Sequence, residues 1–313
     1  MWPGFEGVAL MDNGVFESLK GKIVDFRLRP PTGAYRTFFT PRAVESVNRT
    51  WGNPVPKSYL ASVENRPDAD DHAMEVLFGE MDSVGVRVGV MNGRHSPNRA
   101  VPVHIEDADL VALRDRSKGR LVALSGVNLD LPVQDINDRL EHAVKKLGII
   151  GVCMEPGFAR TPLYADNEKL FPIYQKILDL GVPLQFMSGP FAGPDLSHTD
   201  PVHFDRVGRA FPALPIILGH GCYPYVTEAI ALPYKSDVNG LSNFYLSPDC
   251  YMFAPGGERY AHGVNAMPHR FLFGSAYSFC GVDSAVRRTF DLPIKPEAMP
   301  AYMHENAERL FKL

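Results

Sequence analysis

The sequence predicts an α/β fold of the (β/α)8 TIM-barrel type, and three features carry this prediction. The chain has 313 residues, a length that is common for a single barrel domain. Short apolar runs recur along it, and most are followed by a loop rich in Gly, Pro or Asn and then by a helical stretch. The apolar runs are continuous and do not alternate with polar residues, which is typical of parallel strands buried on both faces.

Eight apolar segments are predicted as the barrel strands, and helical stretches lie between them. The strand segments are residues 22–28, 86–92, 121–127, 148–154, 183–188, 215–220, 243–247 and 270–275. The stretch 70–85 has apolar residues at helical spacing and ends at Gly85. In the stretch 135–148, Asp135 is the predicted N-cap, and lysines and Gly148 close the helix.

One connection is much longer than a barrel needs. Residues 29–72 follow the first strand and exceed an ordinary strand-to-helix loop. Long ordered loops in compact domains are usually functional. We therefore expect one domain over residues 1–313, in which 29–72 form an inserted lid or cap over the mouth of a somewhat distorted barrel.

Composition and charge limit which classes of partner and which cellular compartment are expected for this protein. The formal net charge of −4 argues against a nucleic-acid or anionic-membrane partner, because either favours a basic surface. No apolar run approaches the ~20 residues of a membrane span, and the N-terminal MWPGFEGVALMDNG lacks the basic and apolar regions of a secretory signal. The cysteines show no CxxC pair, which favours free thiols in a cytoplasmic protein. They are Cys153, Cys222, Cys250 and Cys280.

The first predicted strand ends in two arginines. In the stretch KIVDFRLRPP, Arg27 and Arg29 are two residues apart, so in a continuing strand their side chains would lie on the same face. Two adjacent guanidinium groups repel each other. An anionic group is therefore expected opposite them, and a carboxylate fits because guanidinium binds it through paired hydrogen bonds. The alternative is that one arginine pairs with Asp25 or Glu155 and has no role beyond filling the space.

Further candidate site residues are selected by their position at the ends of the predicted strands. In a barrel the chemistry lies at the carboxyl ends of the strands, where the loops begin. Beyond the two arginines, this rule selects Asn92, Arg94, Ser125, Asn128, Glu155, Met187, Ser188, His220, Tyr223, Asp249, Ser275 and Tyr277.

Several of these stretches together are similar to one enzyme family. IVDFRLRPP, MDSVGVRVGVM, FDRVGRAFPALPIILGHGCYP, RFLFGSAYSF and ENAERLFKL resemble the amidohydrolase-2 type branch of the amidohydrolase superfamily, and the resemblance extends from Lys22 to Leu313. That branch includes aminocarboxymuconate-semialdehyde decarboxylase, dihydroxybenzoate decarboxylases and pyrone-dicarboxylate lactonase. The resemblance implies a barrel enzyme that catalyses hydrolysis or decarboxylation, with dimers common.

The resemblance fails at the metal ligands. Metal-dependent members carry His-x-His after the first strand, a His after the fifth, a His after the sixth and an Asp after the FGS of the eighth. The corresponding residues here are Arg27 and Arg29, Met187, His220 and Ala276, so that only His220 is retained. Arginine has no acceptor and keeps its proton, so it cannot ligate a cation. We therefore predict that the usual metal site is lost and expect no cofactor.

The first interpretation is a metal-independent hydrolase that acts on a small carboxylated substrate, either a lactone or a ring acid. The predicted substrate-binding residues are Arg27, Arg29, Arg94, Tyr223, Ser275 and Tyr277. The predicted catalytic residues are His220, Asp249 and Glu155. His220 or Asp249 would activate water, the arginines would stabilise the oxyanion, and Glu155 would balance their charge.

Three alternatives stay open. The first is a decarboxylase of the same family, since the sequence does not separate the two reactions. The second is a barrel without catalysis that pairs with an active homologue. A decayed site should be filled by bulky side chains, whereas a repurposed one should stay open with converging polar groups. The third is a metal held by Glu155, His220 and Asp249, which the nearby arginines disfavour. The partners expected are a small carboxylate and a second copy of the chain, with no nucleic acid or membrane.

Overall fold

The computed structural model describes residues 13–36, 38, 40–241 and 243–313. The N-terminal stretch MWPGFEGVALMDNG, for which the sequence predicts no secretory signal, lies almost entirely outside these residues. Among the described helices, none combines the length and the apolar character needed to cross a bilayer.

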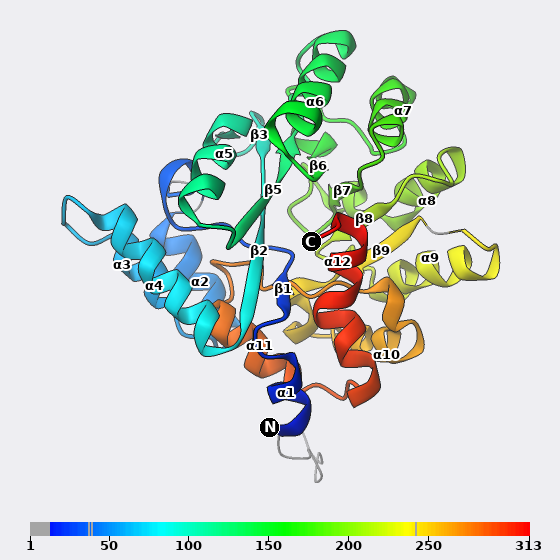
Figure 1. Ribbon diagram of the computed structural model, residues 1–313. Coiled ribbons are helices and arrows are strands. Elements are labelled where there is room, and N and C mark those ends of the chain that lie inside the picture. The colour runs from blue at the N-terminus through cyan, green and yellow to red at the C-terminus, as the bar shows by residue number, and fades with distance from the viewer. Residues whose placement is uncertain (1–12, 37, 39, 242) are drawn as a thin grey trace.

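Parallel strands form one curled sheet at the centre of the molecule (Figure 1), and their order is β1-β2-β5-β6-β7-β8-β9. The strands are β1 (Ile23–Asp25), β2 (Val86–Asn92), β5 (Leu121–Gly126), β6 (Gly151–Met154), β7 (Leu184–Met187), β8 (Ile216–Gly219) and β9 (Phe244–Ser247). Most of their residues are buried on both faces, as the continuous apolar runs predict. The predicted α/β barrel is confirmed for these strands.

The eighth predicted strand, residues 270–275, lies in place between β9 and β1 but forms no regular ladder. Leu272 N donates to Leu246 O at 2.8 Å, and Phe26 N donates to Phe273 O at 2.9 Å, so the segment still closes the ring. The amide of Phe273 instead bonds Tyr302 O at 3.0 Å. Because this amide bonds a residue outside the sheet, residues 270–275 close the ring without forming the regular strand that was predicted.

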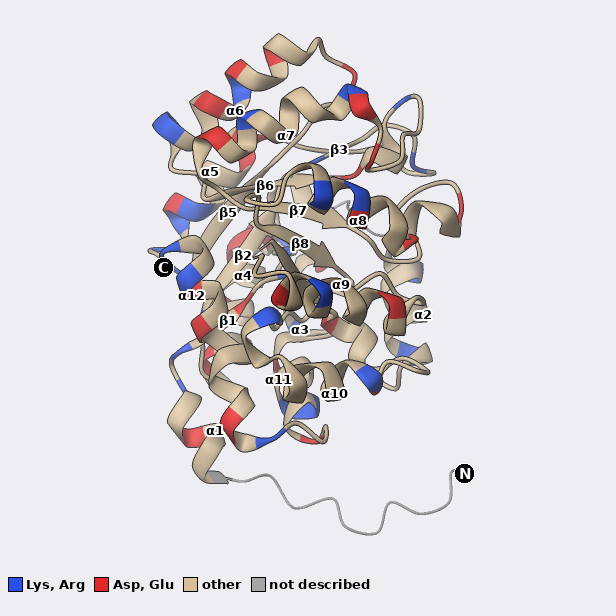
Figure 2. Cartoon of the chain, turned by 90° about the vertical axis from the view of Figure 1, so that its right-hand side faces the viewer, with Lys and Arg blue, Asp and Glu red and all other residues tan. Residues whose placement is uncertain are grey.

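Helices cover the outside of the sheet (Figure 2). The short helix α1 (Asn13–Leu19) precedes the first strand. The helices that cover the sheet are α4 (Ala69–Ser83), α5 (Asp107–Arg116), α6 (Val133–Leu147), α7 (Phe171–Leu180), α8 (Pro201–Ala210), α9 (Val226–Val238), α10 (Arg259–Ala266), α11 (Val282–Phe290) and α12 (Asn306–Phe311). The prediction that Asp135 caps its helix is wrong. Pro132 precedes the first turn of α6, and Asp135 lies within that turn, where its charge suits the positive end of the helix dipole.

The inside of the barrel has its own apolar core, separate from the core between sheet and helices. It contains Val24, Phe26, Val90, Leu124, Cys153, Met187, Ile217, Tyr245, Leu272, Ala307 and Phe311. Helix α12, red in Figure 1, supplies Phe311, whose ring stacks on Phe26 with centroids 5.4 Å apart. The barrel interior is thus packed with side chains and is not a pore.

Two inserted segments extend from the barrel at the carboxyl ends of its strands. The predicted cap 29–72 contains the short η1 (Gly33–Tyr35) and the helices α2 (Pro41–Thr50) and α3 (Lys57–Ser62). It is anchored to the far end of the chain, where Asn48 Nδ2 donates to Ser278 O at 2.9 Å. The second inserted segment is an antiparallel hairpin of β3 (Arg94–Ser96) and β4 (Val103–Ile105), which the sequence did not predict.

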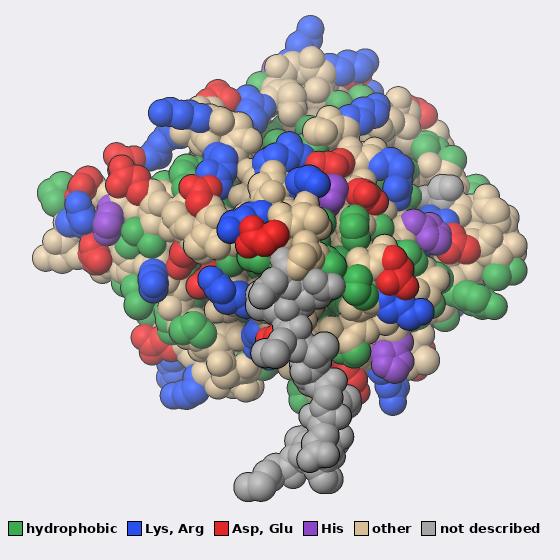
Figure 3. All heavy atoms as spheres, turned by 60° about the horizontal axis from the view of Figure 1, so that its bottom comes forward, with side chains coloured by type: hydrophobic (Ala, Val, Ile, Leu, Met, Phe, Trp, Pro, Cys, Tyr) green, Lys and Arg blue, Asp and Glu red, His purple; other side chains and the backbone are tan. Residues whose placement is uncertain are grey.

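The outer surface carries charges of both signs. On the face shown in Figure 3, Lys and Arg side chains are interspersed with Asp and Glu. That face therefore shows no broad patch of a single charge sign. The concentration of like charge that matters lies inside, at the carboxyl ends of the strands.

Candidate functional site

A cavity of about 530 Å³ opens at the carboxyl ends of the strands. The cap helix α2, the hairpin β3–β4 and the loops after β6, β7 and β8 supply its walls. Its lining is Arg29, Phe38, Thr40, Ala43, Ser46, Val47, Arg94, Arg99, Ala100, Val101, Glu155, Phe158, Met187, Gly189, Phe191, Ala192, Gly193, His220, Tyr251 and Phe279. The site therefore lies where the barrel rule predicts it.

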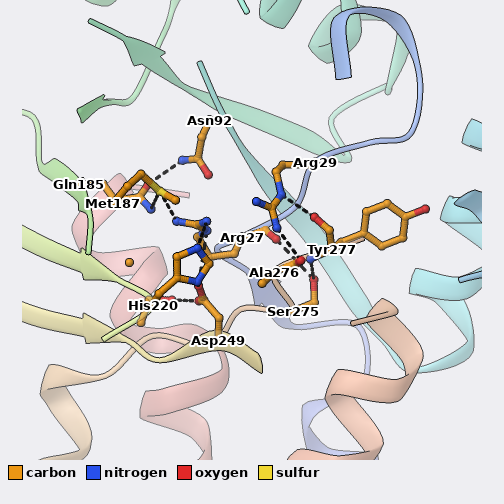
Figure 4. A network of polar contacts seen from close by, with 12 residues as sticks. Arg27, Arg29, Asn92, Gln185, Met187, His220, Asp249, Ser275, Ala276 and Tyr277 are labelled. Atoms are coloured by element: carbon orange, nitrogen blue, oxygen red, sulfur yellow. Dashed lines mark hydrogen bonds and ion pairs between the residues drawn. The ribbon is translucent and has the colours of Figure 1, made fainter. Parts of the chain in front are cut away.

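Arg27 lies beneath this cavity and is completely buried. Figure 4 shows its guanidinium among the ends of β7, β8 and β9. Nη2 lies 3.0 Å from His220 Nε2, Nη1 lies 2.7 Å from Met187 Sδ, and Nε lies 3.6 Å from Asp249 Oδ2. A fixed positive charge thus connects three strands at their carboxyl ends.

His220 and Asp249 form a dyad, with Nδ1 2.9 Å from Oδ2. Guanidinium can only donate, so Nε2 of His220 accepts from Arg27, and the ring proton lies on Nδ1, facing Asp249. Burial, reinforced by the charge of Arg27, lowers the pKa of His220 to about 4. Burial by itself opposes ionisation of Asp249, but Arg27 and His220 hold the pKa of that carboxyl below its usual value. At neutral pH the dyad is a neutral imidazole with a carboxylate.

Arg29 has a different position from Arg27. Its Nε and Nη2 donate to the carbonyl oxygens of Tyr277 and Ala276, both at 2.6 Å, and the side chain lines the cavity. Burial, then the charges of Arg27 and Arg94, lower the pKa of Arg29 well below its ordinary value. The prediction that the two arginines share one face is corrected, because β1 ends at Asp25 and the alternation of a strand does not continue beyond it.

Arg94 and Glu155 form a buried ion pair at the cavity wall. The other carboxylate oxygen of Glu155 accepts from Ser96 Oγ. Burial by itself disfavours the charge, but Arg94 and Arg99 outweigh it and lower the pKa of Glu155. Glu155 is therefore ionised and balances an arginine, but that arginine is Arg94, not Arg27 or Arg29.

Two predicted binding residues lie outside the cavity wall. Ser275 is fully buried, and its Oγ donates to Asp25 Oδ2 at 2.6 Å and accepts from Tyr277 N at 3.0 Å. The hydroxyl of Tyr277 lies 2.6 Å from Ser58 Oγ, away from the cavity. What the Tyr277 backbone contributes is the carbonyl that holds Arg29. Both are thus corrected from substrate-binding to supporting residues, since their polar atoms are already bonded within the protein.

Tyr223 also lies behind the residues that line the cavity. Its hydroxyl donates to Pro255 O at 3.1 Å, and its ring stacks on Tyr251 with centroids 4.9 Å apart. The tyrosine that reaches the cavity is Tyr251, whose ring meets that of His220 edge to face at 5.1 Å. Tyr251 was not predicted from the sequence, although its place two residues after Asp249 in a strand-end loop was a usable signal.

Asp249 also lies behind the lining, with Oδ1 accepting from Ser247 Oγ at 2.5 Å. It orients His220 and does not itself reach the cavity. Ser125 and Asn128 face a separate cavity of about 440 Å³ beside α5 and α6, and Arg94 borders both cavities. The rule of strand ends thus selected the right edge of the sheet but could not assign each residue to a wall.

Most of the aromatic lining and one lining arginine, Arg99, were not predicted from the sequence. Phe38 comes from the cap and Arg99 from the loop of the unpredicted hairpin, while Phe158, Phe191 and Phe279 follow β6, β7 and the irregular eighth segment. These residues lie in loops, where no periodic pattern marks a buried position. Arg99, in RHSPNR just after the second strand, was the one with a positional signal.

The residues present do not fit the metal that the family resemblance implies. The guanidinium of Arg27 lies among Met187, His220 and Asp249, so a cation there would meet a fixed positive charge. Across the part of the chain that the structure describes, no three His, Cys, Asp or Glu side chains are grouped closely enough to hold a metal ion. The alternative ligand set fails too, because Glu155 is paired with Arg94, apart from the dyad.

These features define an α/β barrel with a cationic, aromatic cavity at the carboxyl ends of its strands. Residues 54–313 match the family model described as amidohydrolase, and the chain therefore belongs to the amidohydrolase family. The family predicted from the sequence stretches is thereby confirmed. No curated protein matches the chain.

Solved structures share the fold. An uncharacterized TIM-barrel protein of Bordetella bronchiseptica is 33% identical, with 93% of this chain and 98% of that chain covered and a TM-score of 0.80. A dihydroxybenzoic acid decarboxylase of Polaromonas sp., with bound manganese and 2-nitroresorcinol, is 18% identical, with 94% and 97% covered and a TM-score of 0.61. The 5-carboxyvanillate decarboxylase of Sphingomonas paucimobilis is 14% identical, with 94% and 100% covered and a TM-score of 0.60. The last two likenesses concern the fold alone.

Proposed function

We propose that this protein is an enzyme that binds a small planar ring carboxylate and removes the carboxyl group as CO2 without a metal. The cavity volume of about 530 Å³ lies within the usual range for small-molecule sites. Arginines at its wall suit a carboxylate, and Phe38, Phe158, Tyr251 and Phe279 suit the faces of a ring.

An open cavity supports an enzyme over a barrel that has lost its site. Loss of function should leave the space filled by bulky side chains, and here only the position under the cavity is filled, by Arg27. Above it, charged groups converge on a free volume. Maintaining several buried arginines costs stability, which a function would offset.

The observation that carries the choice of reaction is that the basic atoms at the cavity already have partners. Nε2 of His220 accepts from Arg27, and both oxygens of Glu155 accept from Arg94 and Ser96. Hydrolysis needs a free base to activate water. Decarboxylation needs no activated water. It needs an anchored carboxylate and a proton donor for the ring carbon.

The dyad can supply that proton once an anion is bound. Burial and nearby arginines keep His220 neutral, and a bound anion offsets those charges and raises its pKa. Nε2 then takes a proton in place of its bond from Arg27, and Asp249 stabilises the imidazolium. The C–C bond breaks with its electron pair left on the ring carbon, CO2 departs, and the ring carbon takes the proton from Nε2. The net change is one proton consumed and one CO2 released.

Hydrolysis of a lactone is the second candidate, and the dyad itself favours it. A neutral imidazole held by a carboxylate at 2.9 Å is a general-base arrangement if Arg27 withdraws from Nε2. Arg29 would then stabilise the oxyanion. Both routes need Arg27 to leave Nε2 of His220, but hydrolysis also needs a water molecule placed for activation by that nitrogen, and for that reason it ranks second.

The test is a panel of hydroxybenzoates, benzene dicarboxylates and aromatic lactones, assayed after dialysis against a chelator and with metal content measured. We expect CO2 release from ring carboxylates by metal-free protein, and its loss in His220→Asn. Ring opening of lactones alone would favour the second candidate. Stoichiometric metal that activity requires would overturn the metal-free assignment, and no binding of any ring carboxylate would overturn the proposal itself.

A further inference from the structure

Two histidines face each other across the hairpin β3–β4. His95 of β3 is paired directly with His104 of β4. Their Nδ1 atoms lie 3.0 Å apart, and their ring centroids lie 4.5 Å apart. Because side chains alternate between the two faces of a strand, the histidines point away from Arg94 and Ser96, which contact Glu155 at the cavity wall. The histidine pair therefore lies on the outer face of the hairpin.

Solvent reaches this pair. His104 is exposed, and the side chain of His95 is 15% exposed. His95 also lines the second cavity, the one of about 440 Å³ beside α5 and α6. An ion in solution can thus approach the two rings without entering the cavity at the carboxyl ends of the strands.

A carboxylate sets the tautomer of His95. Nε2 of His95 lies 3.7 Å from Asp130 Oδ2, on the side of the ring away from His104. A carboxylate beside one ring nitrogen favours the proton on that nitrogen. The lone pair of the neutral ring is then on Nδ1 and faces His104. Asp130 is itself held in place, because its Oδ1 accepts from Arg160 N at 3.1 Å and its Oδ2 lies 3.5 Å from Arg160 Nε.

His95 is neutral at neutral pH, as a metal ligand must be. Burial and then the charge of His104 lower the pKa of His95, and the charges of Asp130 and Glu106 only partly oppose this effect. The same two carboxylates make the surroundings of the ring favourable for a cation.

The distance between the two Nδ1 atoms matches a chelating pair. Imidazole nitrogen binds zinc at about 2.0–2.1 Å, so two such nitrogens at a right angle around one ion are about 2.9 Å apart. The observed 3.0 Å also suits a hydrogen bond in which His104 donates to His95. An ion that takes the place of this proton would therefore find both nitrogens in position, with little movement of the hairpin.

We propose that His95 and His104 bind one divalent ion of the late first-row transition metals, Cu²⁺ most tightly and Ni²⁺ next. Imidazole suits these ions, and the order of affinity follows from their chemistry. Asp130 accepts from Nε2–H of His95, the arrangement that commonly orients a metal-binding histidine. Water completes the coordination. With two protein ligands, the site differs from clusters of three or more, of which the described part of the chain has none.

A bound ion would connect two very short strands. Each strand of the hairpin has three residues, and β3 also carries Arg94 and Ser96 to the cavity wall. An ion that binds only the folded hairpin stabilises it by mass action. The inference does not depend on the reaction proposed for the cavity, because the histidines point away from that cavity.

The test uses the untagged full chain after dialysis against a chelator, as wild type, His104→Asn and His262→Asn. Calorimetry measures binding of Ni²⁺, Cu²⁺ and Mg²⁺. His262 is an exposed histidine of α10 outside the hairpin, so its variant removes an imidazole elsewhere. We expect one Ni²⁺ or Cu²⁺ per wild-type chain and no binding of Mg²⁺, which prefers oxygen ligands. His104→Asn should weaken Ni²⁺ binding at least about tenfold, the scale on which even an outer partner of a ligand acts, and His262→Asn should leave it unchanged.

Electron paramagnetic resonance of the one-to-one Cu²⁺ complex gives an independent readout. Two imidazole nitrogens should contribute to the wild-type spectrum and one to that of His104→Asn. Equal Ni²⁺ affinity of wild type and His104→Asn, or no binding of either ion by the wild type, would overturn the proposal. Thermal melting without metal establishes that His104→Asn is folded, since an exposed side chain can be replaced without opening the core.

Discussion

At the scale of single residues, the site depends on what each side chain can and cannot do. Arg27 has donors and no acceptor, so it decides that Nε2 of His220 is an acceptor and that the ring proton faces Asp249. No other titratable side chain carries a permanent charge so reliably when buried. The protonation pattern of the dyad therefore depends on one arginine.

Removing that arginine should be costly. Arg27→Ala leaves Asp249 as a buried carboxylate without its cation, and we expect a loss of about 3–5 kcal/mol in the free energy of unfolding. The pKa of His220 should rise in the variant, because the neighbouring positive charge is gone. Urea denaturation and NMR titration of the imidazole measure the two effects. An unchanged midpoint and an unchanged imidazole titration would contradict this account.

The dyad also predicts a pH dependence of stability. The pKa of His220 is about 4 in the folded protein against 6.5 for an ordinary histidine, so between these values the unfolded chain binds the proton more tightly. The contribution of His220 to the free energy of unfolding is fully present above pH 6.5. It decreases by about 3 kcal/mol as the pH falls toward 4. Denaturation of wild type and His220→Asn from pH 4 to 8 checks this. Parallel slopes for the two proteins over that range would refute it.

At the scale of elements, the irregular eighth segment is held by a carboxylate. Asp25 accepts from the amides of Arg27 and Ser275, both at 2.9 Å, and from the Ser275 hydroxyl at 2.6 Å. Burial raises the pKa of Asp25, so each of these donors matters for holding the charge. The bonds connect the end of β1 to the closing segment where a regular ladder is missing.

Ser275→Ala tests whether that serine is structural. We expect a loss of about 1–3 kcal/mol in stability, since a buried carboxylate loses a donor, and no change in the affinity for ring carboxylates. Ser83→Ala, on the accessible side of α4, removes a hydroxyl that bonds only a backbone carbonyl and should change little. A folded, stable Ser275→Ala with much weaker ligand binding would instead place the hydroxyl in the binding site.

The cap helix α2 should control access to the cavity. Ala43, Ser46 and Val47 of α2 line it, and Ala43 is the smallest of them. Ala43→Leu adds volume inside the free space, so we expect weaker binding of ring carboxylates with stability changed by less than about 1 kcal/mol. Calorimetry and thermal melting measure both. Undiminished affinity would show that the ligand does not pass or contact this wall.

At the scale of the whole molecule, the C-terminal helix completes the barrel. Phe311 is 4% exposed and stacks on Phe26 within the inner core. Phe311→Ala should cost about 3–5 kcal/mol, the usual loss for a buried phenylalanine. Phe191→Ala is the matched control, because that ring is 64% exposed and should contribute little to stability. Equal urea midpoints for the two variants would contradict the packing described.

The family, the barrel and the edge of the sheet that carries the site could all be predicted from the order of the amino acids. Continuous apolar runs, stretches such as FPALPIILGHG and the replacement of four ligand positions are local facts, readable without coordinates. They also led to Arg29, Arg94, Glu155 and His220, which do line the cavity. Features that depend on residue type and on position along a strand were thus predictable.

Which of these residues face the cavity and which support it became clear only from the packed fold. Alternation between faces holds within a strand, and β1 ends before Arg27, so pattern could not separate a buried Arg27 from a lining Arg29. The cap and the hairpin brought Phe38 and Arg99 to the site across long stretches of chain. Contacts between distant loops depend on how the elements pack together, and no periodic pattern in the sequence encodes them.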